Sequence, residues 1–147
     1  MKIEYNNLYV HYILTTKNRH PFIKEINRER IEKYITGIVN NTGSKLYAVY
    51  ANPEHAHLLI SKNPIISDQE LMTVVADSSQ KFIVANKLCS DKFQWQDSAA
   101  AFSVSKGDID KVCKYIMNQP EHHKKKTYQD EYDEFLAFYQ QTLKWER

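Results

Sequence analysis

Two histidines, His55 and His57, are separated by one residue in a short segment with the composition of a buried strand. Side chains alternate between the two faces of a strand, so both imidazoles are expected on the same face. Neutral imidazole is the commonest nitrogen ligand of metals in proteins, and the pair is therefore a candidate for binding a divalent ion. Ordinary strands also contain histidines at this spacing, so the pattern alone leaves a purely structural role open.

A tyrosine and a glutamine further along the chain are candidates to complete such a site. Tyr115 and Gln119 lie four residues apart in a segment expected to be helical, which places the phenol and the amide on one helix face. The amide oxygen can act as a third, harder ligand beside two imidazoles, leaving the phenol next to the ion. Pro120 cannot continue helical hydrogen bonding, so Gln119 is expected in the last turn.

Two clusters of positive charge provide candidate contacts for phosphate. Lys17 and Arg19 lie in a loop after the first predicted strand, and Lys124, Lys125 and Lys126 form a basic run after the predicted tyrosine helix. Lysine and arginine contacts to a nucleic-acid backbone support affinity without reading the base sequence. A solvated turn is an equally good interpretation of the first cluster, and basic runs are usually only solvated.

The pattern of apolar residues predicts the elements that must position these side chains. Strands are expected over 8–16, 45–51, 55–61, 93–96 and 100–105, and helices over 26–41, 67–88, 108–119 and 127–144. The order strand, helix, hairpin, helix, strand is that of an α+β, ferredoxin-like split βαβ fold. We therefore expect an antiparallel sheet with helices packed on one face, followed by C-terminal helices.

Length and composition limit the class of protein. The chain has 147 residues, which suits one domain over 1–147, and 42% of them are hydrophobic. No apolar run approaches the ~18 residues that span a membrane, and the start lacks a signal peptide, so a cytoplasmic protein is expected. The net charge of +2 does not by itself indicate nucleic acid. Cys89 and Cys113 are expected to be free thiols.

Several blocks of sequence, in one order, resemble the single-tyrosine HUH transposases, including the REP-associated tyrosine transposases. They are the Thr16–Arg19 turn, Pro53–Ile60, Trp95–Gln96 with Ala101–Ser105, and Lys114–Gln119 followed by Glu121–His123. Two departures are visible. Ala56 is smaller than the residue usual between the histidines, and Asp97–Ala100 replaces a frequent Gly-Tyr-Gly turn, which could alter a loop near the site.

The resemblance implies that Tyr115 attacks a phosphodiester of single-stranded DNA, leaving a 5′-phosphotyrosine and a free 3′-hydroxyl. It implies that His55, His57 and Gln119 hold Mg²⁺ or Mn²⁺. The substrate would be a folded DNA hairpin at an element end. It further implies a homodimer in which Tyr115 acts in its own subunit or in the other, and it favours phosphate contact by the Thr16–Arg19 turn.

Three other functions compete with this hypothesis. A catalytically silent, domesticated hairpin-binding relative would explain the two departures, although His55, His57, Tyr115 and Gln119 are all present. An RNA-binding sheet domain would be expected to carry an aromatic RNA-binding motif on its first strand, which is missing. A histidine-triad nucleotide hydrolase would need a third alternating histidine, where this chain has Leu59.

Overall fold

A computed structural model of the protein describes residues 1–121, 127, 129–131, 133–134 and 137. The chain divides into two compact units, Met1–Met117 and Asn118–Arg147. Lys124, Lys125 and Lys126 lie outside the described residues, as does most of the helix predicted over 127–144. Residues 129–131, 133–134 and 137 of that helix are helical. Among the described residues, no helix has the length and apolar character needed to cross a membrane.

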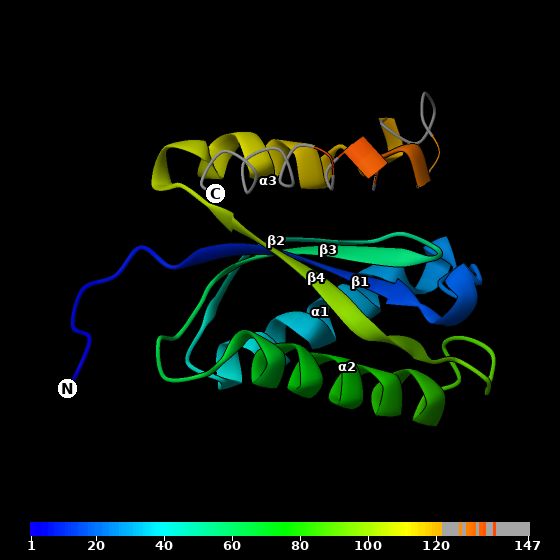
Figure 1. The fold of residues 1–147 in the computed structure, drawn as a ribbon. Coiled ribbons are helices and arrows are strands. Elements are labelled where there is room, and N and C mark those ends of the chain that lie inside the picture. Colours follow the sequence, from blue (N-terminus) through cyan, green and yellow to red (C-terminus); the bar gives the residue numbers. More distant parts are fainter. Residues whose placement is uncertain (122–126, 128, 132, 135–136, 138–147) are drawn as a thin grey trace. The chain divides into compact units, whose positions relative to one another are not determined.

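The first unit is built on a four-stranded antiparallel sheet with the order β2-β3-β1-β4 (Figure 1). Its strands are β1 (Tyr9–Thr16), β2 (Lys45–Ala51), β3 (His55–Ser61) and β4 (Trp95–Val104). β1 and β3 pair at the centre of the sheet, and each also pairs with an outer strand. The predicted antiparallel α+β fold is confirmed.

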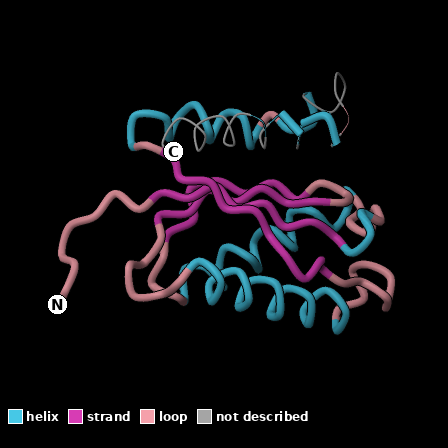
Figure 2. Tube along the Cα trace, viewed as in Figure 1, coloured by secondary structure: helices cyan, strands magenta, loops and turns pink. Residues whose placement is uncertain are grey.

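Helices cover both faces of this sheet (Figures 1 and 2). Helices α1 (Glu25–Asn41) and α2 (Asp68–Ala85) lie on one face, and α3 (Ile109–Met117) packs on the other against β2 and β3. Ser67 caps the start of α2, because its hydroxyl accepts a hydrogen bond from the Glu70 backbone N–H at 3.1 Å. The helix ends at Ala85, slightly earlier than expected.

Strand alternation divides the buried side chains between two cores. Tyr12 and Leu14 of β1 and Leu58 of β3 pack in the core that faces α1 and α2. Leu59, one residue further along β3, packs with Ile116 of α3 in the second core. The odd-numbered positions of β1 and β3, including His55 and His57, therefore face the side of the sheet that carries α3.

Strand β4 differs from the sequence-based prediction of two short strands. It runs unbroken from Trp95 to Val104 and includes residues 97–99, which lie between the two predicted strands. The reason is tertiary pairing, since Ala99 and Ala100 pair with Leu14 and Ile13 of β1. The register shifts between the pairs Leu14↔Ala99 and Thr16↔Trp95. The segment that stands in place of the Gly-Tyr-Gly turn therefore contains an irregularity of strand pairing.

The helix that carries Tyr115 ends earlier than the predicted residue 119. The α3 helix stops at Met117, and Asn118 forms a turn before the short helical stretch of residues 119–121. The sequence pattern predicted one uninterrupted helix containing Tyr115 and Gln119, and this prediction is wrong. Pro120 has no backbone N–H to donate to the carbonyl oxygen of Ile116, so the helical hydrogen bonding of α3 cannot continue through it.

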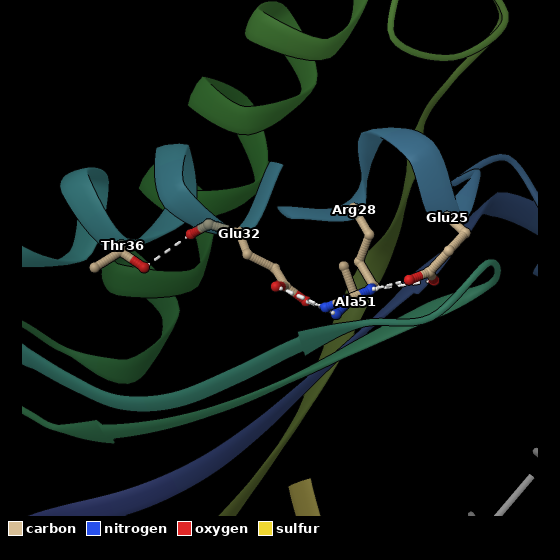
Figure 3. A network of polar contacts seen from close by, with 5 residues as sticks. All are labelled: Glu25, Arg28, Glu32, Thr36 and Ala51. Atoms are coloured by element: carbon tan, nitrogen blue, oxygen red, sulfur yellow. Dashed lines mark hydrogen bonds and ion pairs between the residues drawn. The ribbon is translucent and has the colours of Figure 1, made fainter. Parts of the chain in front are cut away.

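A polar network ties α1 to the end of β2 (Figure 3). The Arg28 guanidinium bridges Glu25 and Glu32, at 3.0 and 2.9 Å. Glu32 Oε2 also accepts a hydrogen bond from the Ala51 backbone N–H at 2.9 Å. The network thus holds the last residue of β2, directly before the turn that leads to His55.

Candidate active site

His55 and His57 open strand β3 and are almost fully buried, at 0% and 1% exposure. The turn before them is closed by a hydrogen bond from the Asn52 backbone N–H to the His55 carbonyl oxygen at 2.7 Å. Their ring centroids are 4.9 Å apart, and each ring offers a nitrogen within 4.8 Å of one on the other ring. The strand therefore presents two convergent imidazoles on a rigid frame.

The hydrogen bonds of His55 define which of its nitrogens has a lone pair. His55 Nδ1 lies 2.9 Å from Glu54 Oε1, and His55 Nε2 lies 3.2 Å from Asn52 Nδ2. In the neutral imidazole, Nδ1 donates to the carboxylate, and Nε2 accepts from the amide. A carboxylate on the far nitrogen is the usual support of a metal-binding histidine, because it fixes the ring and raises the basicity of the ligand.

His57 is supported by a residue that sequence analysis did not assign to the site. His57 Nδ1 lies 2.8 Å from His11 Nε2 in β1. In the sequence, His11 has the position of an ordinary packed or edge histidine of a strand. The presence of His11 on a predicted strand is the feature of the sequence that could have indicated this role. Its contact with His57 follows only from the register of β1 and β3.

Tyr115 lies beside His57 within the first unit. The two ring centroids are 5.8 Å apart and the rings are nearly perpendicular, at 88°. Tyr115 also contacts His11, with the centroids 6.5 Å apart. The side chain is half-buried at the margin of the second core, where Ile116 is the fully buried neighbour. The fold thus brings the phenol next to one of the two histidines of the same chain.

Gln119 belongs to the second unit, where its Nε2 donates a hydrogen bond to Glu131 Oε1 at 3.2 Å. Sequence analysis did not single out Glu131. The assignment of Gln119 as a third metal ligand stays a prediction.

The basic turn after β1 is tied to the segment that carries the histidines. The Thr16 backbone N–H donates to the Glu54 carbonyl oxygen at 2.9 Å, and Thr15 pairs with His55 in the sheet. Asn18 and Arg19 adopt left-handed conformations, with φ of 58° and 55°. Residues other than glycine rarely adopt this backbone conformation, so contacts with the surrounding structure must stabilise the turn. Lys17 and Arg19 are exposed on this turn, as a phosphate-binding role requires.

The donor set of the site fits a divalent metal ion. Both histidines can be neutral and both use Nδ1 in a hydrogen bond, so Nε2 is the nitrogen that would bind a metal. On His55 this nitrogen accepts from Asn52 Nδ2 at 3.2 Å, and that amide would have to move aside for coordination. A neighbouring phenol supplies a nucleophile once it is deprotonated. This combination is suited to a transfer reaction at a phosphate.

Comparison with known proteins agrees with this chemistry. Residues 4–119 match the family described as "Transposase IS200 like", which is most of the chain. The chain belongs to the IS200-like transposase family. Membership supports DNA transposition as the activity, and thus a DNA-processing enzyme. No curated protein matches the sequence of this transposase.

Two solved structures share the fold of this transposase. A candidate transposase from Deinococcus radiodurans R1 is 21% identical, with a TM-score of 0.62 over 81% of this chain and 96% of the other. A REP-associated tyrosine transposase bound to a REP hairpin is 15% identical, with a TM-score of 0.57 over 84% of this chain and 74% of the other. At these identities the likeness concerns the fold alone.

Proposed function

We propose that this transposase cleaves and rejoins single-stranded DNA through a covalent bond between Tyr115 and a 5′ phosphate. The observation that carries the proposal is the position of the Tyr115 ring, 5.8 Å from that of His57 on the face of the sheet that bears both buried histidines. Family membership indicates DNA as the substrate, and Tyr115 is a tyrosine whose ring contacts that of His57.

The Tyr115 hydroxyl would form a bond to phosphorus while the bond from phosphorus to the 3′ oxygen breaks. The phenol gives up its proton, and the departing 3′ oxygen takes one, so a 3′-hydroxyl and a phosphotyrosine result. An unperturbed phenol has a pKa of about 10 and is a weak nucleophile at neutral pH. The covalent bond conserves the phosphoester, so the 3′-hydroxyl of another strand can attack it and release Tyr115.

His55 and His57 would bind a divalent ion through their Nε2 atoms. When bound, the ion would neutralise charge that develops on the phosphate oxygens and on the leaving oxygen. The sequence resemblance suggests Mg²⁺ or Mn²⁺ and adds Gln119 as a third ligand. Two imidazoles also suit heavier divalent ions.

The proposed partner is single-stranded DNA with a folded hairpin. One structural neighbour is described as bound to a REP hairpin, which makes this substrate class the natural expectation for a protein of the same fold and family. Lys17 and Arg19 would contact the backbone, since both are exposed on the turn held by Glu54. Lys124, Lys125 and Lys126 are proposed contacts on sequence grounds. The cytoplasm, where DNA is accessible, is the proposed compartment.

A homodimer is proposed from the resemblance and from the exposed edge of the sheet. Strand β4 ends the sheet order, and among the described residues no strand pairs with its outer edge. An open edge is a ready surface for pairing with a second copy. The contact between Tyr115 and His57 of one chain supports an active site completed within the subunit.

The test is the formation of a covalent adduct. Wild-type protein and the Tyr115→Phe variant would be incubated with labelled hairpin-bearing single strands and Mn²⁺, then separated on a denaturing gel. We expect a slow-migrating adduct for wild type that is absent for Tyr115→Phe and abolished by a chelator. Tyr47→Phe, which makes the same substitution at an exposed tyrosine of β2, serves as the matched control and should form the adduct. DNA binding without any adduct would favour the silent hairpin-binding module.

A further inference from the structure

His11 and His57 form a buried pair at the centre of the sheet. His11 Nε2 and His57 Nδ1 are 2.8 Å apart, and both side chains are 1% exposed. In the register of β1 and β3, His11 pairs with Leu59 and Ile13 pairs with His57, so the two histidines are diagonal neighbours on one face. The contact is therefore determined by the pairing of the two central strands.

This hydrogen bond constrains the proton positions of both rings. In a neutral pair, one of the two facing nitrogens donates and the other accepts. For His57 to bind an ion through Nε2, that atom must hold the lone pair, so Nδ1 must carry the proton. His11 Nε2 must then accept, and the proton of His11 must lie on its own Nδ1.

We infer that His11 is a positioning residue, which selects the tautomer of His57 that binds metal and fixes the orientation of its ring. The inference rests on the proposed function. Hydrogen-bond partners of metal-bound histidines commonly act in this way, and their loss lowers metal affinity about 10- to 100-fold.

The surroundings of His11 suit this role. Its ring contacts those of Phe102 and Tyr115, with both centroids 6.5 Å away and both planes inclined at 66°. Aromatic neighbours limit the rotation of the His11 ring, and the buried position excludes water that could replace its hydrogen bond. His11 supports His57 as Glu54 supports His55, so each of the two proposed ligands has a partner at Nδ1.

The first test is Mn²⁺ affinity, measured on the full chain without DNA by electron paramagnetic resonance. His11→Phe keeps a ring of similar size but no acceptor, and should bind Mn²⁺ about 10- to 100-fold more weakly than wild type. His11→Gln restores an acceptor oxygen at similar reach and should recover most of the affinity. His20→Phe makes the same substitution at an exposed histidine outside the pair, and should stay close to wild type.

Two further measurements separate the possible failures. His57→Ala is expected to abolish Mn²⁺ binding. If wild type itself binds no Mn²⁺, both the proposed metal site and the proposed role of His11 are wrong. If His57→Ala loses binding while His11→Phe binds like wild type, only the inference about His11 is wrong. Should His11→Phe fail to fold, ¹⁵N NMR of the wild-type imidazoles still decides: we expect His57 protonated at Nδ1, and protonation at Nε2 alone would overturn the inference.

Discussion

At the scale of single residues, the site depends on groups that hold the histidines as well as on the histidines themselves. Glu54 connects two parts of the site, since its carboxylate meets His55 Nδ1 at 2.9 Å and its carbonyl oxygen accepts from the Thr16 N–H. The same residue thus links the proposed ligand His55 to the basic turn. Changes at Glu54 are expected to affect metal binding, and changes at Lys17 and Arg19 to affect DNA binding.

Glu54→Gln should weaken metal binding about 10-fold or more, because an amide is a poorer acceptor than a carboxylate for the N–H of His55. Titration with Mn²⁺ in the absence of DNA measures the change. Glu70→Gln, an exposed position on α2, removes a carboxylate away from the site and should bind as wild type does. Equal affinity for Glu54→Gln and wild type would exclude a role for this carboxylate in supporting the ligand.

Replacing both Lys17 and Arg19 with Ala should weaken binding to single-stranded hairpins of any sequence. Each lost phosphate contact should reduce the slope of log affinity against log salt by ~0.7, because fewer counterions are released. Binding curves at several salt concentrations measure both effects. Replacing Lys33 of α1 and Lys81 of α2 with Ala, both at exposed positions, is the charge-matched control. An unchanged slope would mean that the turn does not touch DNA.

At the scale of elements, the connection between α1 and β2 positions the turn before His55. Glu32 accepts the Ala51 N–H, and Arg28 places its guanidinium 4.4 Å from the centre of the Tyr50 ring. Burial raises the pKa of the Glu32 carboxyl above its ordinary value of 4.5, and outweighs the lowering by the Ala51 N–H and by Arg28. The folded protein therefore holds a proton on Glu32 more tightly than the unfolded chain does.

This shift predicts a pH-dependent difference between wild type and Glu32→Gln. The raised pKa contributes stability that is fully present below the unfolded pKa of about 4.5 and is lost as the pH rises through the folded pKa. Glu32→Gln has no such change, so wild type should lose stability relative to the variant as pH rises. Urea unfolding at a series of pH values measures this difference. A constant or opposite difference contradicts the raised pKa. Glu70→Gln, at an exposed position on α2, provides the control substitution.

At the scale of the whole molecule, the exposed edge of β4 governs the expected assembly. Ala99 and Ala101 are exposed, lie two residues apart and share one face of this edge strand. If two copies pair through β4, Lys at both positions should disrupt the dimer, since lysines on edge strands oppose pairing and like charges repel across it. Sedimentation should then report a dimer for wild type and a monomer for the variant.

The control for this experiment is Ile65→Lys, which adds charge at an exposed loop position outside the sheet and should leave the dimer intact. A dimer that survives the two lysines would assign the interface to another surface. Adduct formation in a monomeric variant would further show that Tyr115 serves the histidines of its own subunit.

The sequence alone determined features that depend on local periodicity. Alternation along β3 placed His55 and His57 on one face, and β2 and β3 have the predicted bounds, Lys45–Ala51 and His55–Ser61. The regular spacing of Ile31, Ile35 and Ile38 likewise predicted α1. These elements can be predicted from the sequence because each one must bury one set of its side chains, whichever elements it packs against.

Tertiary structure decided the contacts between elements. The pairing of His11 with His57 depends on the register of β1 and β3, which no spacing in the sequence reveals. Pairing with β1 also made β4 one continuous strand through Asp97–Ala100, although this segment has weak strand propensity. The packing of α3 brought Tyr115 to His57. The physical reason is the same in each case: partners distant in sequence supply the hydrogen bonds and contacts that local propensity does not encode.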